Sequence, residues 1–299
     1  MAHALTARVS AAARVEAADS GHRLEGANSS TEDIEIRLLL EAIRLGYGYD
    51  FREYASKPLR RSLVDAMAVE GVATISAFQE RILHDPAAMH LFLNTVGVTV
   101  TSMFREVELM RCLREEVVPV LRTYPSVRIW TVGCATGEEV YSLAIVLQEE
   151  NVLRRATLYA TDLNDDSLAV ARAGSYPLDR MRPSQERYEL AGGRGKLSDH
   201  YDVSGRNARF HGDLLQNVTW ARHNLVTDAS FNDFHLIICA NVLIYFRPSL
   251  QERAHRLFAE SLVRTGFLGL GKGESLVFSP ESSRYRQVRD GVSMFRKIR

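Results

Sequence analysis

The spacing of apolar residues changes near residue 96. Before that point, apolar residues recur every three or four positions, as on one face of an α-helix, beginning with the series from Ile34 to Leu45. Thr31 can cap this first helix, and the acidic residues after it suit the positive end of a helix dipole. Further helices are predicted over residues 59–69, 75–83 and 86–93. The pattern predicts an all-helical N-terminal domain over residues 31–95.

From residue 96 onward, short apolar runs alternate with longer segments of helical period. Such alternation is typical of a parallel β-sheet with helices on both faces, so an α/β domain is predicted over residues 96–299. The predicted strands are 127–132, 157–160, 218–222, 236–239 and 267–270, with 276–278 and 292–295 as a terminal pair. The predicted helices are 107–121, 138–150, 164–173 and 249–263.

Residues 175–217 are too many for one crossover helix, and they contain a glycine cluster at 192–195. Long insertions in a compact domain usually carry a function. We expect a small inserted antiparallel β-subdomain here.

Residues 1–30 are rich in Ala, Arg, Ser and Gly and lack the continuous apolar core of a secretory signal. Their Arg and Ala would also suit a transit peptide, but three acidic residues (Glu16, Asp19 and Glu25) disfavour one. A disordered tail is expected.

The composition argues against several classes of protein. Among 299 residues, 37 Lys and Arg balance 37 Asp and Glu, so the formal net charge is zero and a general nucleic-acid binder is not expected. The three cysteines (Cys112, Cys134 and Cys239) show neither disulfide nor zinc-site spacing, so no metal and a reducing cytoplasm are expected. No apolar run reaches the roughly 18 residues that span a membrane. A cytoplasmic monomer without membrane insertion is the expectation.

The first predicted strand leads into Gly133-Cys134-Ala135-Thr136-Gly137, and Glu138 and Glu139 follow. A turn between a strand and a helix lies where α/β sheets bind ligands. The spacing is not that of the dinucleotide-binding G-x-G-x-x-G loop, and two carboxylates would repel a pyrophosphate. They suit a ligand with a cationic end, such as the ammonium and sulfonium of S-adenosylmethionine.

Polar residues follow three other predicted strands. Asp162 stands at the end of the second strand, where a carboxylate can accept both hydroxyls of a ribose, although it could also be an ordinary cap of the next helix. Asn224 and Leu225 follow the third strand and could contact an adenine, although Asn is also common in turns. After the fourth strand, Tyr245 could point its hydroxyl into the pocket or pack in the core. His211, His223 and His235 are expected to be structural or exposed.

Four separated stretches together resemble the chemotaxis receptor methyltransferase family, the CheR-type protein-glutamate O-methyltransferases. The stretches are Thr101-Ser102-Met103-Phe104-Arg105-Glu106, Gly133-Cys134-Ala135-Thr136-Gly137-Glu138-Glu139-Val140-Tyr141-Ser142, Ala160-Thr161-Asp162 and Asn241-Val242-Leu243-Ile244-Tyr245-Phe246.

The resemblance implies a class I (Rossmann-like) S-adenosylmethionine-dependent methyltransferase sheet with a helical N-terminal domain and an inserted β-subdomain. It implies methyl transfer to glutamates of methyl-accepting chemotaxis receptors, with S-adenosylhomocysteine as the product, and it places Arg105 and Tyr245 beside the reacting carboxylate. The residues implied as cofactor contacts are Thr101, Arg105, Gly133, Glu138, Glu139, Asp162, Asn224, Leu225 and Asn241.

A basic cluster in the N-terminal domain (Lys57, Arg60 and Arg61) is either a solvated helix face or a docking surface for an acidic helical partner. Under the resemblance, that partner is the chemoreceptor's cytoplasmic helices.

The chain departs from the family at two positions: Ala240 stands where the family commonly has Arg, and Thr99 where it commonly has Asn. Each change removes a polar contact worth about 1–3 kcal/mol. Two alternatives therefore stay open: a cofactor-binding scaffold or sensor with weakened catalysis, and a methyltransferase that acts on another carboxylate acceptor.

Overall fold

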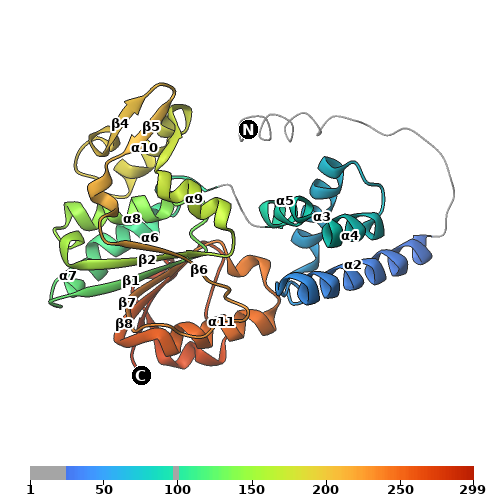
Figure 1. The fold of residues 1–299 in the computed structure, drawn as a ribbon. Coiled ribbons are helices and arrows are strands. Elements are labelled where there is room, and N and C mark those ends of the chain that lie inside the picture. Colours follow the sequence, from blue (N-terminus) through green and yellow to red (C-terminus); the bar gives the residue numbers. More distant parts are fainter. Residues whose placement is uncertain (1–24, 97–100) are drawn as a thin grey trace.

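The computed structural model describes residues 25–96 and 101–299, which form a helical N-terminal part and a larger α/β part (Figure 1). Thr99 and residues 1–24 lie outside the described residues. The departure at Thr99 and the disordered tail expected over residues 1–30 therefore remain predictions. Among the described residues, no helix is long and apolar enough to cross a membrane.

The N-terminal part contains four helices around one apolar core. Buried side chains from each helix meet there, including Leu39, Leu63, Phe78 and Phe92. The first helix begins at Glu25, six residues before the cap predicted at Thr31. The helices are α2 (Glu25–Tyr47), α3 (Ser56–Glu70), α4 (Ile75–His84) and α5 (Pro86–Val96).

The α/β part is built on a seven-stranded sheet of order β6-β2-β1-β7-β8-β10-β9. The first five strands in this order run parallel, and β10 is antiparallel to both of its neighbours. The predicted α/β fold with a mostly parallel sheet is confirmed. The strands are β1 (Val127–Val132), β2 (Ala156–Asp162), β6 (Val218–Arg222), β7 (Phe234–Cys239), β8 (Leu262–Leu270), β9 (Tyr285–Gln287) and β10 (Met294–Lys297).

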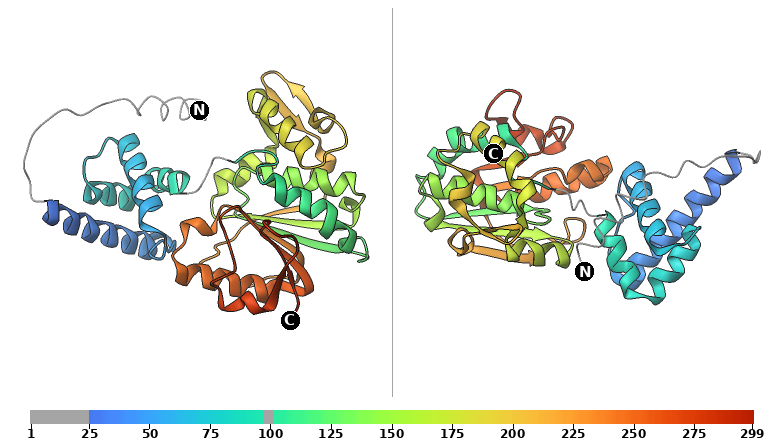
Figure 2. Two further views of the ribbon diagram at one scale, coloured as in Figure 1. Left: turned by 180° about the vertical axis from the view of Figure 1, so that it is seen from behind. Right: turned by 90° about the horizontal axis from the view of Figure 1, so that it is seen from above.

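Successive side chains of the central strands enter opposite layers of the core, as the period of a strand requires. On β1, Ile129 packs with the helices of one face, and Trp130 packs with the other face. The first face is covered by α6 (Val107–Cys112), α7 (Val118–Leu121), α8 (Glu138–Glu149) and α9 (Asp165–Ala173), and the second by α11 (Pro248–Ser261) (Figures 1 and 2).

The strand predicted at residues 276–278 was wrong. Residues 276–278 form a turn, and Tyr285–Gln287 pairs with β10 in their place. The predicted helix 107–121 is observed with these limits, and it contains a π-helical segment at Leu113–Val117. Pro119 lies two residues after this segment and has no N–H to donate to the preceding turn, which accounts for the wider segment.

The insertion forms a separate small sheet of order β3-β5-β4 with antiparallel pairs, as predicted. Its elements are β3 (Ser175–Pro177), α10 (Met181–Leu190), β4 (Tyr201–Ser204) and β5 (Asn207–Phe210). One ion pair joins it to the end of α8: the buried Glu150 carboxylate accepts from Arg194 of the insertion, which is largely exposed, at 2.6 Å. The same carboxylate accepts from the buried Arg114 of the main domain at 3.1 Å.

The two parts of the chain also touch. The backbone of Ala55 donates to the carbonyl of Tyr245 at 2.7 Å, and Arg247 donates to the carbonyl of Glu53 at 2.9 Å. The ring of Tyr54 meets that of Phe246 edge-on, with the centroids 5.1 Å apart. A loop of the helical part is therefore fixed against the residues that follow β7.

Candidate functional site

The loop after β1 passes close to the turn after β7. Gly133 has a φ of 64°, and a Cβ atom built on it would lie 2.5 Å from Cγ2 of Val242. Only glycine tolerates both the left-handed backbone and that close approach. The glycine predicted from the sequence thus brings the ends of two neighbouring parallel strands together.

Asp162 ends β2 and organises the same loop. One carboxylate oxygen accepts the N–H of Ala135 at 2.8 Å, and the other accepts the N–H of Asn164 at 2.9 Å. Burial raises the pKa of Asp162, while these backbone N–H groups act against that rise. Each oxygen retains a further lone pair, so the group can still accept a hydroxyl from a ligand.

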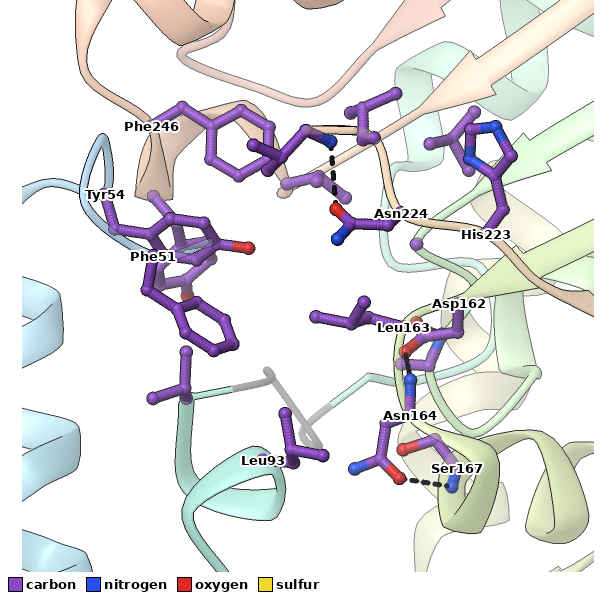
Figure 3. A pocket seen from close by; sticks show the side chains of 18 of the residues that line it. Phe51, Tyr54, Leu93, Asp162, Leu163, Asn164, Ser167, His223, Asn224 and Phe246 are labelled. Atoms are coloured by element: carbon purple, nitrogen blue, oxygen red, sulfur yellow. Dashed lines mark hydrogen bonds between the residues drawn. The ribbon is translucent and has the colours of Figure 1, made fainter. Parts of the chain in front are cut away.

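A first cavity, of about 860 Å³ including its open mouth, lies beyond the carboxyl ends of β1, β2, β6 and β7 (Figure 3). Asp162 and Asn224 line it together with Leu225 and Tyr245. The Asn224 side-chain oxygen accepts the N–H of Val226 at 3.0 Å. The helical part contributes the rest of the wall, with the side chains of Phe51, Tyr54, Leu93 and Val96.

A second cavity, of about 410 Å³, adjoins the first and shares three of its residues, Gly133, Ala135 and Asn241. Thr101, Arg105 and Glu139 line it, and Arg105 is exposed to solvent. Ala240 also lines this cavity, so the departure at that position leaves a methyl group where the family commonly has a guanidinium.

Two carboxylates hold the shared residue Asn241, which has a φ of 62°. Glu106 accepts a hydrogen bond from its side-chain nitrogen at 2.9 Å, and Glu274 accepts its backbone N–H at 3.0 Å. Glu274 also accepts the N–H groups of Leu243, at 2.7 Å, and of Gly271, at 2.7 Å. The turn after β7 is therefore fixed by a buried carboxylate from the loop after β8.

Carboxylates crowd the second cavity. Removal from water raises the pKa of Glu139 to about 8, helped by the negative charges of Glu106 and Glu274 and opposed by Arg105. Such a cluster of acids suits a cation better than an anion. These carboxylates therefore fit the cationic end of S-adenosylmethionine.

The structure brings together all the predicted site residues except one. Glu138 lines neither cavity, because its buried side chain accepts from Thr136, at 2.6 Å, and lies 3.9 Å from Arg180 near the insertion. His223 lines the first cavity, and its ring packs edge-on against Trp130.

The sequence reasoning missed several residues of the site: Glu106, Glu274, Phe51 and Tyr54. Glu106 stands next to Arg105 and could have been noticed for that reason. Nothing in the local sequence marks Glu274 or the aromatic pair. Within residues 25–96 and 101–299, no group of three or more His, Cys, Asp or Glu side chains is placed to hold a metal ion.

Comparison with known proteins agrees with this geometry. The family description "CheR methyltransferase, SAM binding domain" matches residues 99–292, and "CheR methyltransferase, all-alpha domain" matches residues 34–96. A Pseudomonas putida protein named methyltransferase Cher3 is 47% identical over 265 residues, which cover 89% of this chain and 97% of that protein.

Two further relatives are named chemotaxis protein methyltransferases. The protein from Listeria monocytogenes is 28% identical and is covered over 87% of its length by 79% of this chain. Chemotaxis protein methyltransferase 2 of Pseudomonas aeruginosa is 30% identical and is covered over 74% of its length by 68% of this chain. The resemblance drawn from the four motifs is confirmed, and this chain belongs to the CheR family of S-adenosylmethionine-dependent methyltransferases.

Proposed function

We propose that this enzyme methylates glutamate side chains on the cytoplasmic helices of chemoreceptors, forming glutamate methyl esters. The observation that carries the proposal is the pair of adjoining cavities that share Gly133, Ala135 and Asn241, with Arg105 exposed at the second one. The relatives named chemotaxis protein methyltransferases support this acceptor.

The two cavities suit the two ends of the methyl donor. Asp162 would accept the ribose hydroxyls in the first cavity, where Asn224 and Leu225 border the adenine. Glu139 would face the ammonium in the second cavity, beside Thr101. The sulfonium would then lie between them, near the shared wall. S-adenosylmethionine supplies an electrophilic methyl group, so the protein needs little acid–base machinery.

The acceptor glutamate is already ionised at neutral pH. The remaining task is to align one of its oxygens with the methyl group and to remove part of its water. Arg105 would hold the carboxylate through its guanidinium, and Tyr245, which lines the neighbouring cavity, would help orient the acceptor or the donor. Burial raises the pKa of Tyr245, and the nearby positive charge of Arg105 acts against that rise.

The basic cluster of α3 supports a protein acceptor with an acidic surface. Lys57 and Arg61 are exposed, whereas Arg60 is paired with Glu32 and Asp33. Ala55, the residue before α3, donates to the carbonyl of Tyr245 at 2.7 Å, so the start of α3 lies beside the pocket. An acidic helix docked on α3 would bring its glutamates towards Arg105.

The decisive experiment incubates the protein with methyl-labelled S-adenosylmethionine and chemoreceptor-bearing membranes. Base-labile label on the receptor is the expected result, because glutamate methyl esters hydrolyse in base. Cofactor binding by calorimetry without any label would favour the scaffold or sensor instead, and label on a different acceptor would favour the other methyltransferase.

Arg105→Ala tests the acceptor site. We expect kcat to fall by about 100-fold or more, because the carboxylate loses its positively charged partner. The matched control is Arg154→Ala, since Arg154 is an exposed arginine that precedes β2 and lines neither cavity. Transfer at the wild-type rate by Arg105→Ala would contradict the assignment.

A further inference from the structure

The loop after β8 presents two exposed apolar side chains. Val277 is 69% exposed and Phe278 is 95% exposed. A phenylalanine that is almost wholly in water makes no contribution to the fold's own core, and exposed apolar groups near a binding site commonly mark a contact surface.

The loop is held firmly in spite of this exposure. Leu276 is buried in the same apolar cluster as Leu243, and the N–H of Val277 donates to the hydroxyl of Ser275 at 3.1 Å. The carboxylate of Glu274 accepts four backbone N–H groups, from Asn241, Leu243, Ile244 and Gly271. The backbone is thus fixed where the two apolar side chains point outward.

These bonds also place the loop beside the acceptor site. Glu274 accepts the N–H of Ile244, whose side chain is 45% exposed and which directly precedes Tyr245. In the first cavity, the predicted contacts Gly133, Asp162, Asn224 and Leu225 follow β1, β2 and β6, whereas Asn241 and Tyr245 follow β7 and Phe278 follows β8. Ile244, Val277 and Phe278 therefore follow β7 and β8, which lie on the other side of β1 from β2 and β6, the strands that lead to Asp162 and Asn224.

We infer that this apolar rim (Ile244, Val277 and Phe278) is a docking surface for the methyl-accepting protein. The inference rests on the proposed function. Its occupant is an amphipathic helix of the acceptor, with apolar side chains next to the glutamate that receives the methyl group. The acidic face of that helix meets two exposed cations: Arg105, which lines the second cavity, and Arg61 on α3, whose preceding residue Ala55 donates to the carbonyl of Tyr245.

Phe278→Ser in the full-length protein tests the inference. Chemoreceptor-bearing membranes are titrated at saturating labelled S-adenosylmethionine. We expect KM for the receptor to rise about 5- to 20-fold, because the contact buries much of an aromatic side chain. The value of kcat at saturating receptor and the calorimetric affinity for the cofactor should stay at their wild-type levels. Phe278→Leu keeps an apolar side chain, so its KM for the receptor should return most of the way to the wild-type value.

The matched control is Val170→Ser, because Val170 is a 43% exposed apolar residue on α9. An unchanged KM for Phe278→Ser, or an equal rise for Val170→Ser, overturns the docking surface while leaving the proposed function intact. A wild-type protein that binds the cofactor and labels no receptor overturns the proposed function itself, and the docking surface with it.

Discussion

At the scale of single residues, the charge of the second cavity depends on carboxyl groups that lie near Arg105. Glu139 has its pKa raised to about 8, first by removal from water and then by the charges of Glu106 and Glu274. A neutral carboxyl group must lose its proton before it can pair with an ammonium group. Binding of the cofactor should therefore release a proton from Glu139.

The pH dependence of cofactor affinity tests this coupling. Affinity should rise between about pH 6 and pH 8, by at most about tenfold per unit, because the ionised form of Glu139 becomes more populated as the pH approaches its raised pKa. The ligand's own amino group loses its proton near the top of this range. Glu139→Gln is the control that isolates the protein's share, since it cannot ionise. Calorimetric affinities with the same pH slope in both proteins would contradict the coupling.

Single residues of the site differ in how visible they are in the sequence. Gly133 and Asp162 follow predicted strands directly, so strand topology alone places them at the binding edge. Glu274 is distant in sequence from the turn that it holds, and its function exists only as four hydrogen bonds to other parts of the chain. Glu138 shows the reverse: its type and position suggested a cofactor contact, yet its side chain turns towards Thr136.

At the scale of elements, the turn after β7 and the loop after β8 behave as one unit. Gly271 lies where they meet, and a Cβ atom there would come within 2.3 Å of the Asn241 side-chain nitrogen and 2.7 Å of its backbone nitrogen. Neither segment can move without shifting the other. The position of Asn241 in both cavity walls thus depends on a glycine in a different loop.

Gly271→Ala is predicted to damage the site without unfolding the protein. The forced shift should cost about 1–3 kcal/mol of stability, as overpacking usually does, and should weaken cofactor binding because Asn241 is displaced. Calorimetry with S-adenosylhomocysteine, together with thermal unfolding, measures both effects. Gly212→Ala is the control, since a Cβ atom at Gly212 would meet no other atom within 4 Å. Unchanged affinity in Gly271→Ala would show that the two segments move independently.

The limits of a helix or strand were predicted well where the element is buried, because burial makes its apolar residues recur with a regular spacing. Strand β1 was predicted with its observed limits, and it is buried along nearly its whole length. Residues 276–278 have strand-like composition, but Glu274 and Leu276 anchor a turn there instead. An apolar run becomes a strand only if a neighbouring edge is available to pair with it, and here Tyr285–Gln287 occupies that edge.

At the scale of the whole molecule, the helical part completes the first cavity. Phe51 and Tyr54 line it across from Asp162 (Figure 3). Their loop is joined by backbone hydrogen bonds to Tyr245 and Arg247. A second link joins the side chain of Asn164, which caps α9, to Asn94 on α5 at 2.5 Å. The N-terminal domain therefore forms part of the proposed cofactor site as well as the proposed acceptor surface.

Tyr54→Ser is expected to weaken cofactor binding about 5- to 20-fold, because part of the apolar wall over the ligand is lost. The control is Tyr49→Ser, which removes a half-buried tyrosine of the same region that does not line the cavity. Calorimetry with S-adenosylhomocysteine gives the affinities. Equal affinities for the two variants would show that the helical part does not contribute to cofactor binding.

The sequence by itself determined the fold class and placed Gly133, Asp162 and Asn224 at strand ends, because hydrophobic period is a local property that parallel-sheet topology converts into position. The resemblance of the four motifs supplied the family and further pocket residues such as Thr101, Arg105 and Asn241. Only the tertiary structure decided which carboxylates act together, where Glu138 points and how the helical part closes the cavity. Those features depend on side chains far apart in the chain that meet only after the sheet has formed. The exposed Phe278 belongs with them, since no sequence pattern distinguishes an apolar residue held outward from one that is buried.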